Sequence, residues 1–225
     1  ITFQVKKGET VGIIGGTGSG KSSIINLIPR FYDVSGGRVR IFGKDVRDYN
    51  INSLRSIIGV VPQKSVLFTG TIRENIRWGK EDAADEEVKE AADIAAAGEF
   101  IEKFPDGYRT FVARGGVNLS GGQRQRLTIA RALVRKPKIL LLDDSFSALD
   151  FVTDSRVRKG IRDFTKGMTT FIVSQRTGTI RNADKIIVLD DGKIAGIGTH
   201  EKLIEECGLY REICQSQMKE NGVNV

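Results

Sequence analysis

The sequence is poor in the residues that build disulfides, histidine metal sites and membrane spans. Its 225 residues include two cysteines and one histidine, and aromatic residues make up 7% of the chain. Cys207 and Cys214 are too far apart for a CxxC pair and too few for a disulfide framework, so we expect reduced thiols. With His200 as the only histidine, a zinc site is not expected. No apolar run approaches the roughly 18 residues of a membrane-spanning helix, and no signal peptide is recognisable.

The charge is unbalanced in the positive direction, with a formal net charge of +7. Such a surplus suits an anionic partner, either nucleic acid or a phosphate ligand with an acidic neighbouring surface. The lysines and arginines are scattered and no aromatic-studded basic stripe is present, so nucleic acid is not expected. The chain begins at Ile1 within ITFQV, which is predicted as a strand, and we expect it to be a piece of a longer polypeptide.

Short β-branched runs that are apolar on both faces alternate with helical segments, which predicts an α/β core with a mainly parallel sheet. Asp191-Gly192 separates two of these runs and predicts a hairpin. Between residues 71 and 136 helical patterns dominate. We therefore predict an α/β core over 1–70 and 137–225 and a helical subdomain over 71–136. The predicted strands are 10–15, 57–61, 138–144, 169–174 and the hairpin 185–198.

GGTGSGKS, residues 15–22, follows a predicted strand and precedes an apolar helix, which is the context of the phosphate-loop (Walker A) motif. Its glycines let backbone N–H groups turn towards phosphate oxygens, Lys21 supplies charge to the β and γ phosphates, and the Ser22 hydroxyl is a Mg²⁺ ligand. A plain glycine-rich turn is the alternative. The motif predicts nucleoside triphosphate binding by Gly15, Gly16, Thr17, Gly18, Ser19, Gly20, Lys21, Ser22 and Ser23.

KILLLDD, residues 138–144, is a predicted buried strand that ends in two acids. Beside a phosphate loop, Asp143 fits the Walker B position, where a carboxylate holds Mg²⁺ near Ser22. Without that loop the double acid would indicate only a turn.

LSGGQRQRLTIARAL, residues 119–133, begins with a predicted N-cap, Ser120, followed by two glycines. A first turn without side chains is an anion site, because its N–H groups and positive dipole end are accessible. A capped helix with a solubilising Arg/Gln face is the alternative. Since the chain already has a phosphate loop, a second anion site requires a second molecule. The predicted contact residues are Ser120, Gly121, Gly122 and Gln123.

At these motifs the sequence resembles the ABC ATPase family, and the resemblance covers the whole chain. LSGGQ is similar to the family's signature, VVPQKSVLFTGTIRENI to the Q-loop region of its exporters, SALD to the D-loop, and GTHEKLI to the C-terminal segment. The resemblance implies a P-loop NTPase fold of the RecA-like type with an inserted helical subdomain, ATP and Mg²⁺ as ligands, and Gln63 as a metal-contacting, catalytic Q-loop glutamine.

The same resemblance implies partners. Two nucleotide-binding domains of this family pack head to tail, so that each ATP lies between one phosphate loop and the other chain's signature helix. Transmembrane domains are implied either ahead of Ile1 or on partner subunits, which places the domain at the cytoplasmic face of the cell membrane. Arg114 departs from the family, in which exporters often carry a Glu before the signature, and this puts the usual contact with the membrane domain in doubt.

Two further departures fall at the catalytic positions. The resemblance predicts a Glu after the Walker B Asp and a His after the next core strand, but this chain has Asp144 and Gln175. Asp is shorter than Glu, and a base displaced by about 1 Å can lose roughly 10²-fold in rate. Gln can donate to a phosphate but cannot carry a proton. The pair resembles the weakly hydrolysing subunit of a heterodimeric exporter. A homodimeric exporter with Asp144 as a slow base, and a non-transport ABC protein acting on nucleic acid, remain alternatives.

Base recognition is predicted to be weak. Exporters of this family usually carry an aromatic residue well ahead of the phosphate loop that stacks on adenine, and the chain begins too close to Gly15 to include it. Phe3 is expected to pack into the core from its strand. We therefore expect weak ATP binding with GTP nearly as good, and any strong adenine preference would implicate Phe3 or Phe31.

Overall fold

The computed structural model describes residues 1–220, with the side chains of Phe151, Lys219 and Glu220 left out of the description. The chain divides into two compact units. The first unit comprises residues 1–55, 141–144 and 167–225, and the second comprises 56–140 and 145–166. The sequence-based boundaries, with the helical subdomain at 71–136, stay a prediction about how the domains are organised.

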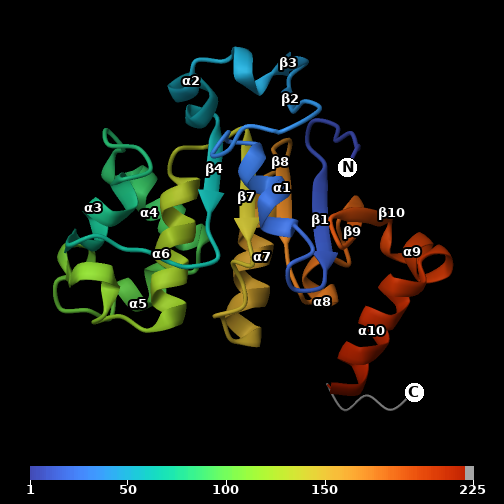
Figure 1. The fold of residues 1–225 in the computed structure, drawn as a ribbon. Helices are drawn as coiled ribbons and strands as arrows, with labels where there is room; N and C mark the ends of the chain where they lie inside the picture. The colour runs from blue at the N-terminus through green and yellow to red at the C-terminus, as the bar shows by residue number, and fades with distance from the viewer. Residues whose placement is uncertain (221–225) are drawn as a thin grey trace. The chain divides into compact units, whose positions relative to one another are not determined.

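A six-stranded sheet runs through the fold in the order β10-β9-β1-β8-β7-β4 (Figure 1). β1 is parallel to both β8 and β9, and β10 is antiparallel to β9, so the predicted mainly parallel α/β sheet is confirmed. β7 is divided between the two units. The strands are β1 (Thr10–Gly15), β4 (Ile58–Val61), β7 (Ile139–Asp143), β8 (Thr169–Val173), β9 (Lys185–Asp190) and β10 (Lys193–Gly198).

The strands form where the sequence is apolar on both faces. Every residue of β7 is buried, and so are five of the six residues of β1. A strand of this kind is stable only when both faces are covered, as in a parallel sheet with helices on its two sides. The predicted hairpin is also confirmed, because Asp191 and Gly192 join β9 to β10 with φ angles of 41° and 72°. Positive φ at both positions is the requirement of a type I′ turn.

The first unit also holds the helix that follows β1 and the C-terminal helices (Figure 1). A buried cluster in this unit packs Tyr210, Cys207 and Cys214 against Ile14 of β1 and strand β9 residues Ile186 and Val188. Its remaining elements are α1 (Lys21–Leu27), β2 (Arg40–Ile41), β3 (Lys44–Asp45), η1 (Val46–Asp48), most of α2 (Ile51–Ser56), α8 (Thr177–Ile180), α9 (His200–Glu206) and α10 (Gly208–Glu220).

The second unit is mainly helical, as the sequence predicts for residues 71–136, and its helices α4 and α5 are separated by a left-handed residue. Ala96 adopts a φ of 52°, which ends α4, and α5 starts at Gly98. A Cβ at Gly98 would lie 2.2 Å from the Asp93 carboxylate, so a larger residue there would require the Asp93 side chain to move. The elements are β5 (Gly70–Thr71), α3 (Ile72–Arg77), α4 (Asp85–Ile94), α5 (Gly98–Ile101), η2 (Gly107–Arg109), β6 (Phe111–Val112), η3 (Arg114–Gly116), α6 (Gly121–Leu133) and α7 (Phe151–Phe164).

The strand predicted at residues 1–5 is wrong. Phe3 and Val5 are half-buried while their neighbours are exposed, so the side chains do alternate. These residues nevertheless pair with no strand, and without ladder hydrogen bonds the alternation does not make a strand. Phe3 is therefore not held in the core by a strand. No helix among the described residues has the length and apolar character needed to cross a membrane.

Candidate functional site

The predicted phosphate loop connects β1 to α1. α1 begins at Lys21 after Gly20, whose φ is 94° and whose position provides no side-chain cap for the helix. The first backbone N–H groups of α1 are therefore not occupied by a capping side chain. A helix N-terminus with accessible N–H groups and its dipole directed outwards favours an anion.

The glycines of the loop leave room for a ligand. At Gly15 a Cβ would lie 2.2 Å from the carbonyl oxygen of Leu189, so the chain passes too close to β9 for any side chain. At Gly16, Gly18 and Gly20 a Cβ would meet no atom within 4 Å. The space beside these three residues is open, which is the cradle that a phosphate chain requires. Thr17 and Ser23 are exposed, and Ser19 is buried.

Lys21 is 8% exposed and lies against the loop. Its Nζ donates to the carbonyl oxygens of Gly15 at 2.9 Å and Gly16 at 2.6 Å, and to Ser19 Oγ at 3.4 Å. Burial lowers the pKa of the ammonium group, and the negative charges of Asp144 and Asp143 oppose that shift. The cation is thus held at the loop by weak neutral acceptors, which phosphate oxygens would replace with stronger, charge-assisted bonds.

Ser22 and Asp143 meet, although 121 positions separate them in the sequence. The Ser22 hydroxyl donates to Asp143 Oδ1 at 3.0 Å. Burial raises the pKa of the Asp143 carboxyl, while the Ser22 hydrogen bond and the Lys21 charge lower it. The described residues contain no cluster of three or more His, Cys, Asp or Glu side chains that could hold a metal ion. One hydroxyl and one carboxylate fit Mg²⁺, which typically takes one or two protein oxygens together with substrate phosphates and waters.

Asp144 follows the end of β7 with a φ of 45°, a left-handed conformation that is uncommon outside glycine and tolerated best by Asp and Asn. Its backbone N–H donates to the Val173 carbonyl oxygen of β8 at 3.0 Å. The negative charge of its carboxylate raises the pKa of Lys21 more than that of Asp143 does, although burial lowers it more. This acid therefore acts electrostatically on the lysine of the predicted phosphate loop.

Gln175 is exposed and lies beyond the end of β8. The Ser174 N–H donates to the Ile13 carbonyl oxygen of β1 at 3.1 Å, which continues the sheet pairing by one residue. The backbone carbonyl of Gln175 accepts a hydrogen bond of 2.6 Å from Gln217 Nε2 of α10. Sequence reasoning did not find Gln217, because no motif connects it with this loop.

α6 begins as predicted at Ser120, but its N-terminus is closed by its own side chains. Ser120 Oγ accepts from the Gln123 N–H at 3.2 Å, and Gln123 Oε1 accepts from the Ser120 N–H at 2.8 Å. This is a reciprocal capping box, which supplies partners for two of the helix-end donors. Gly121 is exposed and Gly122 half-buried, and neither adds a side chain to the first turn, but the expectation of a bare helix end is not met because Gln123 folds back onto it.

Gln63 is exposed in the turn after β4, and its role at the metal stays a prediction. Downstream of it, α6 holds the following segment through contacts that the sequence did not indicate. The Ser65 hydroxyl donates to Gln125 Oε1, and Arg131 donates to the Val66 carbonyl oxygen at 2.8 Å. Burial lowers the pKa of Arg131 to about 10. Arg114, the departure before the signature, is exposed in η3.

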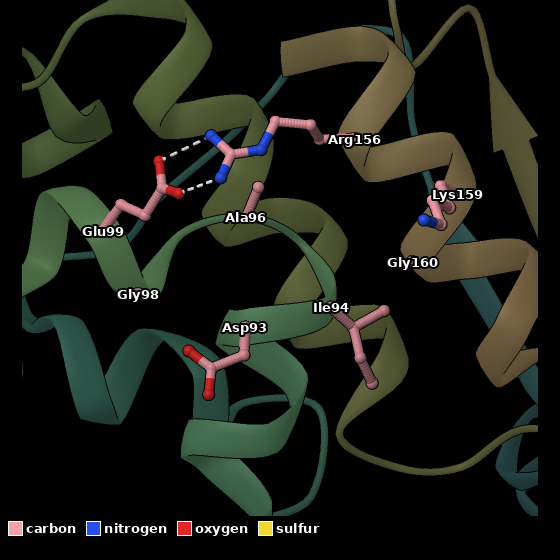
Figure 2. Close-up of a pocket in the computed structure, with 8 residues that line it drawn as sticks. All are labelled: Asp93, Ile94, Ala96, Gly98, Glu99, Arg156, Lys159 and Gly160. Atoms are coloured by element: carbon pink, nitrogen blue, oxygen red, sulfur yellow. Dashed lines mark hydrogen bonds and ion pairs between the residues drawn. The ribbon is translucent and has the colours of Figure 1, made fainter. Parts of the chain in front are cut away.

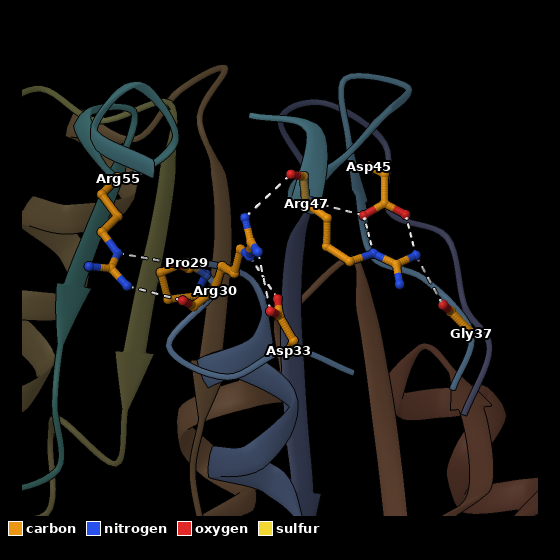
Figure 3. Close-up of polar contacts among 7 residues, drawn as sticks. All are labelled: Pro29, Arg30, Asp33, Gly37, Asp45, Arg47 and Arg55. Atoms are coloured by element: carbon orange, nitrogen blue, oxygen red, sulfur yellow. Dashed lines mark hydrogen bonds and ion pairs between the residues drawn. The ribbon is translucent and has the colours of Figure 1, made fainter. Parts of the chain in front are cut away.

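The segment after α1 carries a network of paired charges (Figure 3). Arg30 pairs with Asp33 at 2.7 Å and Arg47 pairs with Asp45 at 2.8 Å. The Arg55 guanidinium lies 5.2 Å from the centre of the Phe31 ring, which is 47% exposed. One face of that ring therefore already has a cationic partner. Arg30 and Arg47 are neutralised by neighbouring acids, and Arg55 donates to the backbone carbonyl oxygens of Pro29 and Arg30.

The second unit contains a cavity of about 430 Å³ between α4, α5 and α7 (Figure 2). An ion pair joins Arg156 to Glu99 beside it. At Gly160 a Cβ would approach the Ile94 carbonyl oxygen to 2.7 Å, so the helices pass too closely there for a side chain. None of the residues lining this cavity is a predicted site residue, and we treat it as a packing gap.

Comparisons with known proteins agree with this geometry. The family profile described as ABC transporter matches residues 1–147. The chain is 49% identical over 222 residues to the uncharacterized ABC transporter ATP-binding protein YfiB of Bacillus subtilis (strain 168), covering 99% of this chain and 38% of that protein. It is 47% identical over 220 residues to the uncharacterized ABC transporter ATP-binding protein Rv1273c of Mycobacterium tuberculosis (strain ATCC 25618 / H37Rv), covering 96% and 38%.

Among solved structures, the chain resembles that of a bacterial Atm1-family ABC exporter with ATP bound. The two share a TM-score of 0.93 and 44% sequence identity over 96% of this chain and 38% of that chain. The present chain thus spans less than two fifths of the length of the proteins that it matches.

Proposed function

Because the chain belongs to the ABC transporter family, we propose that it is the ATP-binding motor domain of an exporter, and that its own site holds ATP but hydrolyses it slowly. It pairs head to tail with a second, non-identical nucleotide-binding domain, and the pair drives transport by transmembrane domains. The exporter assignment is supported by the Atm1-family exporter whose structure this chain resembles along 96% of its length. As part of such an exporter, the domain would lie at the cytoplasmic face of the cell membrane.

The contact between Ser22 and Asp143 is the observation that carries the ATP-binding part of the proposal. It brings the end of the phosphate loop and the end of β7 within one hydrogen bond, with Lys21 buried beside both acids. Lys21 and the loop N–H groups bind and orient the triphosphate, and Ser22 and Asp143 hold Mg²⁺. The metal, when bound, neutralises charge on the β and γ phosphates.

The slow-hydrolysis part rests on Asp144 and Gln175. A general base must lie within about 2.6–3.2 Å of the proton that it accepts. Asp144 is one methylene shorter than Glu, and its backbone is held by the bond to Val173, so the side chain alone must close the gap. Gln175 can donate to a γ-phosphate oxygen but cannot carry positive charge or relay a proton. Groups that bind are present, while groups that activate water are altered.

The partner part rests on α6. Residues 120–123 are not expected to contact the nucleotide of their own chain. We expect their capping box to open and bind the ATP held by the phosphate loop of a second domain. This chain would thereby complete the site of that domain. Transmembrane domains would contact the Q-loop region around Gln63, where Arg114 reverses the charge that exporters often carry.

Two measurements on the chain test this proposal. Calorimetric titration should show weak ATP binding that requires Mg²⁺, with GTP binding nearly as well, because Lys21, Ser22 and the loop amides contact phosphate and no base. Sedimentation should show a monomer without nucleotide and association only with ATP and Mg²⁺, favoured by a competent partner domain. A stable dimer without nucleotide would contradict the head-to-tail assembly, and tight adenine-selective binding would implicate Phe3 or Phe31 in stacking.

A homodimeric exporter ATPase with Asp144 as a slow base is the second candidate. The observation in its favour is that the negative charge of Asp144 raises the pKa of Lys21 more than that of Asp143 does. Steady-state hydrolysis by the chain alone separates the two readings. Substantial turnover that is lost in Asp144→Asn would support the slow base, whereas turnover that stays negligible until a competent partner is added supports the asymmetric pair.

A further inference from the structure

The C-terminal helix α10 contacts the loop that carries Gln175. Gln217 Nε2 donates to the backbone carbonyl of Gln175 at 2.6 Å. Gln217 Oε1 accepts from both the N–H and the Oγ1 of Thr177, each at 2.9 Å. One side-chain amide therefore bonds the residues on both sides of Arg176. Because three hydrogen bonds converge on one side chain, the loop has a defined position relative to α10.

These contacts compensate for a missing cap. α8 begins at Thr177, and the residue at its N-cap, Arg176, makes no side-chain hydrogen bond to the helix. The first N–H of a helix has no intrahelical acceptor, and a side-chain oxygen usually supplies one. Here Gln217 supplies it from another helix. The conformation of the loop between β8 and α8 thus depends on a residue about forty positions further along the chain.

α10 is itself held in place by packing, so the contact through Gln217 gives the Gln175 loop a fixed position. Tyr210 is fully buried and Cys214 is 3% exposed, both within the cluster that includes Ile14 of β1. The Tyr210 hydroxyl and His200 Nδ1 are 2.9 Å apart, which joins α10 to α9. Ile14 directly precedes the first glycine of the phosphate loop. One buried cluster therefore supports both the strand that leads to the phosphate loop and the helix that holds the Gln175 loop.

We propose that Gln217 is a positioning residue for the predicted γ-phosphate contact at Gln175, and that α10 sets the orientation of this loop. The inference rests on the proposed function for the role of residue 175, but the contact itself does not. Because Gln217 bonds the backbone of residue 175, it acts equally on the glutamine present here and on a histidine placed there. α10 is thereby part of the nucleotide site without touching nucleotide.

Three single variants of the chain separate this role from a structural one. Gln217→Met removes both halves of the contact while keeping the side-chain length. Gln217→Glu keeps the acceptor for Thr177 but loses the donor to Gln175 and places a carboxylate oxygen against its carbonyl. Ser216→Ala is the matched control, since the Ser216 hydroxyl bonds only the Ile213 carbonyl oxygen of its own helix in the contacts described.

The first readout is amide hydrogen exchange without nucleotide. One net hydrogen bond is worth about 1 kcal/mol, or roughly fivefold in an opening equilibrium. Gln217→Met should therefore raise the exchange rate of the Thr177 amide by about fivefold, while strand β8 stays protected. Gln217→Glu should keep Thr177 protected, and Ser216→Ala should change neither.

The second readout is ATP hydrolysis. Each variant is combined with Asp144→Glu and Gln175→His in the same chain, and a partner nucleotide-binding domain with an intact signature helix is added. Gln217→Met and Gln217→Glu should both lower kcat by roughly fivefold and leave KM for ATP within about twofold, because the binding groups at Lys21 and Ser22 are unchanged. Ser216→Ala should retain the parent values of both constants.

Unchanged exchange at Thr177 and unchanged kcat in Gln217→Met would overturn the inference. A fall in kcat that is accompanied by an equal rise in KM and by lower thermal stability would show that Gln217 has only a structural role, and it would overturn the inference as well. Failure of the parent chain to bind ATP would instead refute the proposed function, and the exchange experiment would still decide whether Gln217 holds the loop.

Discussion

Helices α1 and α6 are both predicted to bind phosphate at their N-termini, but the two ends are built differently. α1 starts after Gly20, has no side-chain cap, and has a buried lysine as its first residue. α6 starts after Ser120 and is closed by the reciprocal bonds between Ser120 and Gln123. The N-terminal N–H groups of α1 have no side-chain acceptor before a ligand arrives. At α6, by contrast, two N–H groups already have side-chain acceptors.

This difference indicates different demands on the two ends. A site that binds nucleotide within one chain gains from a preformed loop, because little ordering is required when the ligand enters. A site completed only on assembly must remain stable while it is exposed to water, and a capping box stabilises the free helix end. The comparison predicts that damage to α1 reduces binding by the isolated chain, while damage to the cap of α6 affects helix stability and assembly.

The largest effect is expected from Lys21→Met. Charge-assisted hydrogen bonds contribute about 1.5–3 kcal/mol, so losing the ammonium should weaken MgATP binding by roughly 10- to 100-fold. The fold should persist, because methionine retains the buried stem. Calorimetric titration measures the change. Ser120→Ala is the matched comparison at α6 and should bind ATP as the parent chain does. Equal losses in both variants would erase the distinction between the two helix ends.

A gain of at most similar size is expected when Asp144 and Gln175 are replaced by the residues that the family resemblance predicts. Asp144→Glu together with Gln175→His should raise turnover by up to about 10²-fold in the presence of an intact signature helix, and by more than either change alone. The two groups act on one water and one phosphate, so their effects are not additive. Single-turnover hydrolysis with excess enzyme measures this step. If the double variant binds ATP but turns over no faster, the account of a weakly hydrolysing site is wrong.

The smallest effect is expected from Ser120→Ala. Removing an N-cap hydroxyl costs about 1 kcal/mol, which for a chain of this size lowers Tm by roughly 2–4 °C. Thr71→Ala is a matched control, because Thr71 and Glu74 form the same capping box on α3. Both variants should lose similar stability in a thermal melt, but only Ser120→Ala should weaken ATP-dependent association. An equal effect of the two on association would assign Ser120 a purely structural role.

Much of the core was predictable because its signals are local. The strand predicted at 10–15 has the same bounds as β1, and the strand at 169–174 differs from β8 by one residue. Asp191-Gly192 forms its hairpin as expected, since only a primed turn suits that dipeptide between two strands. The predictions failed where one local pattern has two outcomes. ITFQV alternates like a strand but has no pairing partner. The break between α4 and α5 was not foreseen either, because nothing in its alanine neighbours indicates the left-handed conformation of Ala96.

The candidate site was predictable to a similar extent. Gly15 to Ser23 and Ser120 to Gln123 are contiguous motifs, and the structure places both at helix N-termini. The left-handed turn at Asp144, the capping box that closes α6 and the contacts of Ser65 and Gln217 were not foreseen. Each of these depends on which backbone or side chain lies opposite, and spacing along the chain carries no such information.

The sequence by itself therefore determined the chemistry that is available: a predicted phosphate loop, a paired acid after a buried strand, a glycine-led helix, and Asp and Gln where the family resemblance predicts a Glu and a His. Only the tertiary structure decided which of these groups meet. The strand order places β1 next to β8 and thereby aligns the ends of strands that are distant in the chain. Ser22 reaches Asp143 across 121 positions and Gln217 reaches Gln175 across 42, because packing of apolar strands and helices, rather than any local preference, fixes those distances.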